Sequence, residues 1–349
     1  MYLSSPTGLA VHSNSPHWHD DAASANRMPA VWPSAAWTIG SACLTGILLE
    51  VSVHPKPGLV TPRSMGSHAD MDLQTFMLTS AAIAPCFHRC AAIGLAHSGK
   101  SCSGAAAVLP LIRAVGRDYD RRLFAASNGV NTQRGALFAL GLTAAAAGLS
   151  YDGLPQDGLS DDGHRACSPD RLFAAVAAIT SGIVERELKG CDRERLTAGE
   201  ILYARHGATG IRGEAEAGFP TVAKHGLPAL RAALAQQAGL NRALLHALVA
   251  IVAEAEDTTV LWRGGPEGLA FVRERAAAVR DLGGALTARG LAEIDRFADA
   301  CVARRLSPGG GADLLAVTAA VHLLEAESFP ASATSRFDPP PAPVPGDNP

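Results

Sequence analysis

The chain has 349 residues, of which 48% are hydrophobic, so it is long and apolar enough to build one large core or two ordinary domains. Its 30 Lys and Arg residues are balanced by 33 Asp and Glu residues, and the resulting net charge of -3 argues against nucleic acid as a partner. Only 5% of the residues are aromatic, whereas alanine and glycine are abundant, which favours closely packed helices over sheets.

The sequence predicts neither a membrane span nor a secretory signal. The longest central run without a charged residue, 135–151, is diluted by Gly, Thr and Ala, whereas a membrane-spanning helix needs about twenty strongly apolar residues. The first 33 residues lack a basic start followed by an apolar run. We therefore expect a cytoplasmic protein with no membrane partner, in which the seven scattered cysteines are reduced and mostly buried.

Apolar residues recur with helical spacing between two ends that lack any such pattern. Residues 1–33 and the proline-rich residues 329–349 are predicted to be disordered tails. About ten helices are expected between them, near residues 37–53, 70–96, 101–121, 134–150, 221–238, 241–256, 266–282, 290–306 and 311–327, with others that start at Ser168-Pro169 and at Thr197. No segment reads convincingly as a strand, so the predicted fold class is all-α.

One long Asp- and Gly-rich linker, residues 152–167, interrupts the helical pattern and is the point at which the chain might be divided into two domains. The polar motifs that follow lie on both sides of this linker and must meet to form one site. We therefore predict a single helical domain over residues 34–328, with the linker as a surface insertion. Ser168-Pro169 and Thr197 with Glu200 are strong helix-start signals after it.

Polar, glycine-rich segments lie at five of the predicted helix junctions. Helices supply the core of a helical protein, so such segments are where a site is expected. The five junctions cover residues 50–72, 129–135, 210–220, 254–266 and 307–313. None matches the Walker A or dinucleotide-binding fingerprint, and the sequence contains no G-x-S-x-G or H-E-x-x-H motif.

The first two junctions offer groups that suit a metal or an anion. Asp70 in the first junction is either an N-cap or a ligand for metal or substrate, and the sequence leaves both open. In the second, Asn131 or Thr132 is expected to cap a helix whose first turn contains Arg134. A positive side chain at the start of a helix is unfavourable with respect to the helix dipole, so its presence there indicates that it binds an anion. The alternative is an ordinary helix cap with a solvated arginine.

The remaining junctions add arginines, carboxylates and glycines. The third carries Arg212 and two carboxylates between three glycines, although a surface turn with local ion pairs is an alternative. In the fourth junction, Arg263 is followed by Gly264, Gly265 and a helix that starts with proline, and the free N–H groups of such a helix start suit a phosphate. The fifth junction is also a glycine-rich segment that leads into a helix. Together the five junctions supply the groups that bind a nucleoside polyphosphate with Mg²⁺.

At these residues the sequence resembles the triphosphoribosyl-dephospho-CoA synthase family. The matching segments occur in the family's order and are Glu50-Val51, Pro55-Lys56-Pro57-Gly58-Leu59-Val60, Gly66-Ser67-His68, Asp70-Met71, Gly129-Val130-Asn131-Thr132, Arg212-Gly213-Glu214-Ala215, Gly218-Phe219-Pro220, Arg263-Gly264-Gly265, Pro308-Gly309-Gly310 and Ala312-Asp313-Leu314-Leu315-Ala316. The resemblance implies an all-α fold and a reaction of ATP with 3′-dephospho-CoA that gives 2′-(5″-triphosphoribosyl)-3′-dephospho-CoA and adenine. Two positions depart from the family pattern: Gln133-Arg134 replaces His-Lys, and Thr259 replaces Asn.

The resemblance also implies roles for individual residues. Positive charge builds on the ribose as adenine leaves, so one carboxylate should accept the proton of the acceptor hydroxyl and another should face the sugar. These two carboxylates are predicted to be Glu214 and Asp257, in either order. The predicted Mg²⁺ ligands are Asp70, Asp72 and Asp313. The predicted substrate-binding groups are Lys56, Arg134, Arg212 and Arg263 for the phosphates, with His68, Asn131, Gly264, Gly265, Gly309 and Gly310; His68 either contacts adenine or braces its loop.

Two other classes of function stay open at this point. A noncatalytic helical adaptor would use the alanine-rich helices as a scaffold and expose an apolar patch. An ADP-ribosyl-type hydrolase is also helical and rich in carboxylates, but in that enzyme water attacks C1′ of the ribose.

The first junction also carries an indication of the pathway. Val60-Thr61-Pro62 and Gly66-Ser67-His68 resemble the malonate decarboxylase branch of the family more than the citrate lyase branch. We therefore expect the product to pass to a holo-carrier-protein synthase that serves malonate decarboxylase, with citrate lyase as the alternative. The sequence does not determine the oligomeric state.

Overall fold

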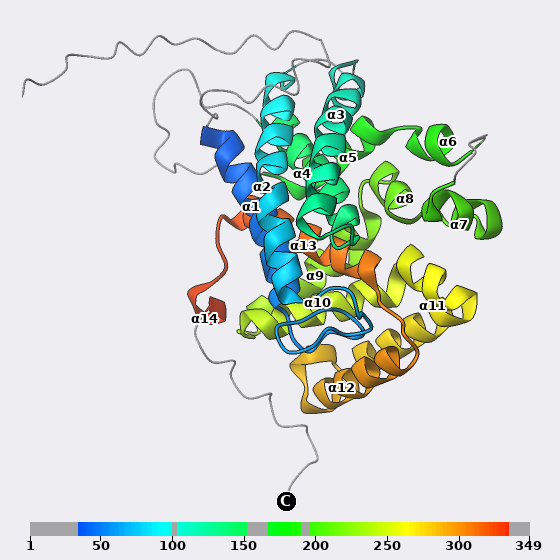
Figure 1. Ribbon diagram of the computed structural model, residues 1–349. Coiled ribbons are helices and arrows are strands. Elements are labelled where there is room, and N and C mark those ends of the chain that lie inside the picture. The colour runs from blue at the N-terminus through cyan, green and yellow to red at the C-terminus, as the bar shows by residue number, and fades with distance from the viewer. Residues whose placement is uncertain (1–33, 100–102, 152–166, 190–195, 335–349) are drawn as a thin grey trace, which may run out of the picture.

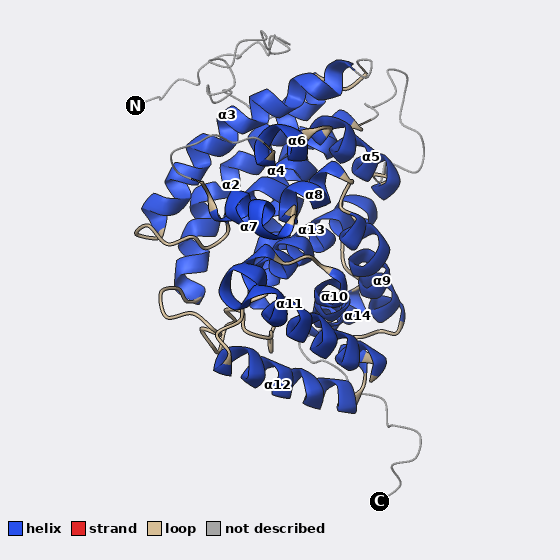
Figure 2. Ribbon diagram, turned by 90° about the vertical axis from the view of Figure 1, so that its right-hand side faces the viewer, coloured by secondary structure: helices blue, strands red, loops and turns tan. Residues whose placement is uncertain are grey.

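The computed structural model describes residues 34–99, 103–151, 167–189 and 196–334. Within these ranges the chain is helical and has no β-strand, as Figure 2 shows. The prediction of a single all-α domain is therefore confirmed. The predicted tail 1–33 and residues 152–166 of the predicted linker lie outside the described residues.

The helices are joined by connections of different lengths, and a long described one, residues 53–72, lies between α1 and α2. Their bounds are α1 Ser34–Ser52, α2 Leu73–Ala96, α3 Ser103–Ala126, α4 Arg134–Leu149, α5 Pro169–Thr180, α6 Ile183–Leu188, α7 Ala198–His206, α8 Gly210–Glu216, α9 Leu227–Ala235, α10 Leu240–Glu254, α11 Thr258–Asp281, α12 Ala288–Ala303, α13 Gly309–Ala326 and α14 Ala331–Thr334. A π-helical turn, Val222–Gly226, leads into α9, and a 3₁₀ turn, Gly284–Leu286, precedes α12.

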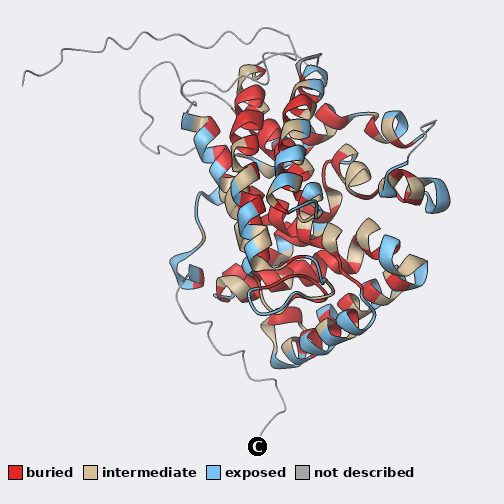
Figure 3. Cartoon of the chain, in the orientation of Figure 1, coloured by how far each residue is buried: buried red, intermediate tan, exposed pale blue. Residues whose placement is uncertain are grey.

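Helix α13 is the element on which the two parts of the fold meet. Helix α2 packs against α1, α3 and α4, and both α1 and α4 pack against α13. On its other side α13 contacts α10, which packs against α9 and α11 (Figure 1). Figure 3 shows buried residues concentrated along these contacts. Because α13 is buried on nearly all sides, the N-terminal end of this helix can bring groups from both parts of the chain together.

Helices α1 and α2 are long and apolar enough to cross a membrane, judged by length and composition alone. In this fold, however, both contribute to the core. Ile47 and Val51 of α1 and Ile83 and Phe87 of α2 are all buried. A core helix of a helical protein has the same composition, so packing accounts for their apolar character.

Several helix boundaries differ from the prediction, and caps explain the differences. Helix α11 begins at Thr258, well before the expected start near residue 266, because the Asp257 carboxylate caps it. The chain then bends at Gly265, where φ is 63°, before Pro266 continues the helix. The third junction, expected to be a loop, is largely the short helix α8. Its three glycines and its charged residues concealed the helical segment.

Two capping predictions are corrected. The N-cap of α4 is Gln133, without a side-chain hydrogen bond to the helix, so neither Asn131 nor Thr132 caps it. The N-cap of α2 is Asp72 rather than Asp70, and it forms a reciprocal capping box with Thr75. The predicted capping box of Thr197 with Glu200 at the start of α7 is confirmed.

The ordered chain also continues past the boundary predicted at residue 328. The Phe329 ring lies 4.8 Å from that of His322 on α13, centroid to centroid, and Ala333 in α14 is buried. Residues 329–334 therefore belong to the folded domain.

Candidate active site

Two adjoining cavities lie where the predicted junctions converge. One has a volume of about 310 Å³ and is lined by the first junction, α1, α4, α11 and α13. The other has a volume of about 450 Å³ and is lined by α3, α4, α7, α8, α11 and α13. Six residues line both cavities: Asn131, Arg134, Gly135, Thr259, Trp262 and Asp313. We call the first the acidic cavity and the second the arginine cavity, for the side chains described below.

Asp313 lies on the wall that the two cavities share. It is in the second turn of α13, and the start of α4 approaches it so closely that a Cβ at Gly135 would lie 1.9 Å from its carboxylate. Burial raises the pKa of Asp313 well above its usual range, and the negative charges of Asp257 and Glu50 raise it further. A hydrogen bond from the Ala136 backbone opposes this shift. Asp313 is therefore a carboxyl group under electrostatic strain that can be reached from either cavity.

Glu50 and Lys56 form a buried ion pair beside the acidic cavity. Glu50, near the end of α1, lines this cavity, while Lys56 reaches it from the first junction and donates to its carboxylate and, at 2.7 Å, to its backbone carbonyl. The Lys56 side chain is only 1% exposed and lines neither cavity. Lys56 was predicted to bind a phosphate, but in this arrangement its ammonium group binds Glu50 instead.

His68 and Arg263 are joined on the opposite wall of the acidic cavity. An Arg263 Nη2 group lies 3.1 Å from Nδ1 of His68, and Nε2 of His68 lies 2.9 Å from the Ser307 hydroxyl. Burial, followed by the Arg263 charge, lowers the pKa of His68, so the ring is neutral and accepts from Arg263 at Nδ1. Arg263 also donates to the Ser67 carbonyl. The predicted brace role of His68 is supported by these contacts, and both residues line the cavity.

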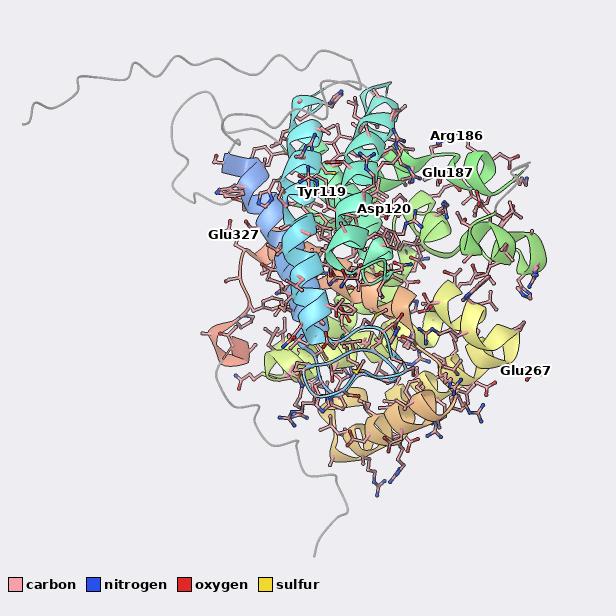
Figure 4. All side chains as sticks on the ribbon, in the orientation of Figure 1. Tyr119, Asp120, Arg186, Glu187, Glu267 and Glu327 are labelled. Atoms are coloured by element: carbon pink, nitrogen blue, oxygen red, sulfur yellow. The ribbon has the colours of Figure 1, made fainter. Side chains whose placement is uncertain are left out.

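The arginine cavity is lined by Arg113, Arg134 and Arg212. A single carboxylate, Glu187, pairs with two of them: its Oε1 lies 2.5 Å from Arg113 and its Oε2 lies 2.8 Å from Arg212. Arg134 pairs with Asp120 at 2.9 Å. Figure 4 labels Asp120 and Glu187 at this side of the molecule. Three guanidinium groups oriented by carboxylates on one cavity wall form a suitable site for a diphosphate or triphosphate.

Glu214 faces the arginine cavity from α8. Its carboxylate accepts hydrogen bonds from the Thr221 hydroxyl at 2.5 Å and from the Thr221 backbone N–H at 3.2 Å. Burial raises the pKa of Glu214, and the nearby Glu256 contributes in the same direction, while the Thr221 hydrogen bonds oppose the shift. A positioned carboxyl group with a raised pKa on a cavity wall is what a general base requires.

Asp257 occupies a different environment from the other predicted catalytic carboxylate. It is buried and lines neither cavity. One oxygen accepts from the N–H groups of Thr259 and Val260, and the other accepts from Gly311 N at 2.8 Å. Asp257 therefore fastens the N-terminus of α11 to that of α13. A Cβ at Gly310 would lie 3.1 Å from this carboxylate, which favours glycine at that position.

The predicted glycines are divided between the cavities and the packing around them. Gly309 lines the acidic cavity and Gly310 lines the arginine cavity. Gly264 and Gly265 line neither cavity, and a Cβ at Gly264 would meet Leu306 at 2.5 Å. The second pair therefore serves the bend and packing of α11.

The three predicted Mg²⁺ ligands are not brought together. Asp72 is the α2 cap and lines neither cavity, whereas Asp70 is exposed at the edge of the acidic cavity and Asp313 lies at its inner wall. Among the described residues, no three His, Cys, Asp or Glu side chains are grouped closely enough to hold a metal ion. Single carboxylates of Glu50, Asp70 and Asp313 nevertheless line the acidic cavity, and one carboxylate oxygen suits a Mg²⁺ ion whose other ligands are phosphate and water.

Several site residues, Glu50 and Asp120 among them, were not predicted from the sequence. Arg113 and Glu187 come from α3 and α6, outside the five junctions. Trp262 lines both cavities and is 54% exposed, which is unusual for so large an apolar side chain. The Asp257 cap is the signal that would have placed Trp262 on the second turn of α11.

Comparisons with known proteins agree on one family. The CitG family model, described as ATP:dephospho-CoA triphosphoribosyl transferase, matches residues 36–330. A probable 2-(5″-triphosphoribosyl)-3′-dephosphocoenzyme-A synthase from Malonomonas rubra is 41% identical over 84% of this chain and 90% of its own. The corresponding synthase from Klebsiella pneumoniae is 39% identical over 84% of this chain and 92% of its own. No solved structure matches the chain significantly.

The chain belongs to this family. The match to the triphosphoribosyl transferase family confirms the resemblance that the junction motifs indicated, and it covers all the helices that line the two cavities. At the position where the family pattern has histidine, Gln133 lines the acidic cavity, and its side-chain oxygen accepts from the hydroxyls of Thr79 at 2.9 Å and Ser80 at 3.2 Å. Thr259, which replaces asparagine, lines both cavities.

The strained environment of Asp313 predicts that its removal stabilises the protein. Because the pKa of Asp313 is higher in the folded than in the unfolded state, the folded protein binds more protons between the two values, and stability falls as the pH rises through that window. We expect the Tm of Asp313→Asn to exceed that of the wild type by a few degrees at about pH 7, with little difference near pH 3.5, below the ordinary aspartate pKa of ~3.9.

The measurement is thermal unfolding followed by circular dichroism across this pH range. Asp281→Asn is a matched control, because its carboxylate is 77% exposed and its charge is solvated. A Tm for Asp313→Asn below that of the wild type at neutral pH would contradict the electrostatic description of the site.

Proposed function

We propose that the protein transfers the triphosphoribosyl group of ATP to 3′-dephospho-CoA and releases adenine. The observation that carries this proposal is the shared wall of the two cavities. Each cavity has cationic side chains suited to phosphates, and Asp313 can be reached from both. Two phosphorylated substrates bound in the two cavities would therefore meet at a carboxylate. The description of the family names the same two substrates, and the names of the related synthases give the corresponding product.

The reaction makes one bond to C1′ of the ATP ribose and breaks another. The ribose 2′-hydroxyl of dephospho-CoA attacks C1′ as the bond from C1′ to N9 of adenine breaks, so positive charge develops on the sugar. The hydroxyl proton passes to a carboxylate, and adenine leaves with a proton. The site must therefore provide one carboxylate within reach of the hydroxyl and a second negative charge near C1′.

Glu214 and Asp313 are the carboxyl groups that suit these two roles. Glu214 was predicted for one of them, and its raised pKa and its position on the arginine cavity support it. Asp313 was predicted as a metal ligand, but its access from both cavities supports a place next to the reacting sugar. We assign Asp257 the role of a positioning residue, because its oxygens are held by three backbone N–H groups.

The charge of each cavity supports a different substrate. The acidic cavity suits ATP with Mg²⁺, where Glu50 or Asp70 would supply a carboxylate oxygen and phosphate and water would supply the other ligands. When bound, Mg²⁺ neutralises charge on the triphosphate. Arg263 and the α13 N-terminus, at Gly309, supply further positive charge. The arginine cavity then suits the diphosphate of dephospho-CoA, which carries less charge and needs no ion.

Trp262 has the properties of a base-stacking residue. Its exposed ring lines both cavities on the second turn of α11. An aromatic ring that is left in contact with a cavity gives a purine a flat apolar surface on which to stack. The ring is thus suited to adenine from either nucleotide.

The product is proposed to serve malonate decarboxylase through a holo-carrier-protein synthase in the cytoplasm. The first junction supports this branch through Val60-Thr61-Pro62 and Gly66-Ser67-His68. In the structure, Thr61 is paired with Ser64 by a backbone bridge and lines neither cavity. Val60 and His68, in contrast, line the acidic cavity.

The proposed transfer predicts that adenine release depends on both dephospho-CoA and Mg²⁺. Purified protein is incubated with ATP, and adenine is measured by chromatography with each component omitted in turn. We expect adenine and the triphosphoribosylated product in equal amounts only in the complete mixture. Equal adenine formation without dephospho-CoA would instead identify a hydrolase, in which water attacks C1′.

The different environments of the two predicted catalytic carboxylates give opposite expectations for their amide variants. Glu214→Gln should lower kcat by at least about a hundredfold with little change in Tm, because it removes a general base at nearly constant volume. Asp257→Asn should lower the stability by about 1–3 kcal/mol, because its new amide donor faces a backbone N–H donor.

These expectations are tested by kinetics and thermal unfolding of the same preparations. Glu216→Gln is a control on α8, since Glu216 lines neither cavity. If Asp257→Asn lost turnover while its Tm was unchanged, Asp257 would have to be regarded as a catalytic residue. Normal turnover in Glu214→Gln would show that Glu214 is not one.

The pathway proposal is tested by offering the product to apo carrier proteins. The purified product and a holo-carrier-protein synthase are added to extract of the source organism, and prosthetic-group attachment is followed by mass spectrometry. We expect attachment to a malonate decarboxylase carrier subunit. Attachment to a citrate lyase carrier alone would overturn the pathway and leave the reaction unaffected.

A further inference from the structure

A third cavity lies beside the arginine cavity, in a groove between α2, α3 and α4. Its volume is about 140 Å³, and it is partly open to solvent. Leu109 and Ile112 of α3 and Leu137 and Leu142 of α4 form its apolar walls. Such a groove beside a polar site suits a narrow, largely apolar ligand segment.

The groove adjoins the arginine cavity. Arg113, Arg134 and Phe138 line both spaces. The Arg113 guanidinium lies 4.9 Å from the centre of the Phe138 ring, which helps to fix the arginine at the boundary. A ligand that passes from the cavity into the groove therefore crosses between two guanidinium groups.

We infer that this groove binds the pantetheine arm of dephospho-CoA. The inference rests on the proposed function and extends it by assigning the acceptor a subsite of its own. Dephospho-CoA consists of adenosine joined through a diphosphate to pantetheine. With the diphosphate between Arg113 and Arg134, the adenosine side extends toward Glu214 and Asp313 and the arm extends into the groove.

The chemistry of the groove matches that of the arm. The arm begins with a gem-dimethyl group and a hydroxyl, continues through two amides and ends in a thiol. Apolar side chains along the walls suit its methyl and methylene groups, and Arg117 and Asp120 at the rim provide hydrogen-bonding groups for its hydroxyl and amides. Cys86 and Cys90 line the α2 side, where both are buried with their sulfur atoms 4.0 Å apart.

This subsite also separates the two nucleotides. Both substrates carry adenosine and a chain of phosphates, so neither feature alone prevents ATP from occupying the acceptor position. Only dephospho-CoA has an arm beyond the diphosphate, and burial of the arm adds affinity for the acceptor alone. The groove is thus a specificity determinant for the acceptor.

Gly116 allows the groove to be blocked without disturbing the core. It lines the groove on α3, and a Cβ built on it would have no other atom within 4 Å. Gly116→Leu therefore extends a side chain into open space, and leucine favours the helix more than glycine does. Ala107→Leu is the matched control: Ala107 is exposed on α3, and nine residues of helix place it on the opposite face from Gly116.

Isothermal titration calorimetry measures the binding of dephospho-CoA and of ADP, which lacks the arm, to the wild type and to the variants Gly116→Leu, Gly116→Ala and Ala107→Leu. We expect Gly116→Leu to weaken dephospho-CoA binding about tenfold or more and to change ADP binding by less than about twofold. Gly116→Ala, which adds one methyl group, should weaken it less. Ala107→Leu should bind both ligands as the wild type does, and the Tm of each variant reports folding.

The inference is overturned if folded Gly116→Leu binds dephospho-CoA as the wild type does. It is also overturned if the wild type binds dephospho-CoA no more tightly than ADP. Adenine release by the wild type separates this result from the proposed function. If the wild type turns over and Gly116→Leu binds dephospho-CoA normally, only the assignment of the groove is refuted. If the wild type releases no adenine in the complete mixture, the proposed transfer reaction is refuted.

Discussion

The close approach of α4 to Asp313 is the contact on which the site depends. At this point the first turn of α4 leaves no room for a side chain, so position 135 must be glycine. The approach also encloses the Asp313 carboxyl group among other negative groups, which raises its pKa. Such strain destabilises the folded protein at neutral pH, and it persists because α13 is held firmly by the helices around it. A strained carboxylate gains most from a bound cation or from positive charge on a substrate.

The Asp257 cap maintains this arrangement from the other side. It ties the starts of α11 and α13 together through backbone N–H groups of both helices. Since α11 carries Trp262 and Arg263 and α13 carries Asp313, one buried carboxylate fixes the starts of the two helices that carry these groups. The positioning role that we propose for Asp257 follows from these contacts.

The sequence predicts the fold class and most helices because their apolar spacing is regular, as in α1, α10 and α13. It also identifies the junctions that converge, since glycines and charged residues are rare inside core helices. What it cannot provide is the partner of each charge. Lys56 and Asp72 are typical ligand residues, yet one pairs with Glu50 and the other caps α2. Conversely, Arg113 and Glu187 lie within ordinary helical patterns, and only tertiary packing brings them to the arginine cavity.

The division of charge between the cavities follows from the order in which the chain contributes to them. The carboxylates of the acidic cavity come from the first junction, from α1 and from α13, elements that pack against one another in the core. The arginines of the other cavity come from α3, α4 and α8, and Glu187 and Asp120 orient them. Helices α4 and α13 both line both cavities, and α4 contacts Asp313 of α13 closely at Gly135. Arg134 of α4 and Asp313 are therefore held at a fixed separation. The same packing that forms the core thereby sets a phosphate-binding cation at a fixed position from the carboxylate where the two substrates are proposed to meet.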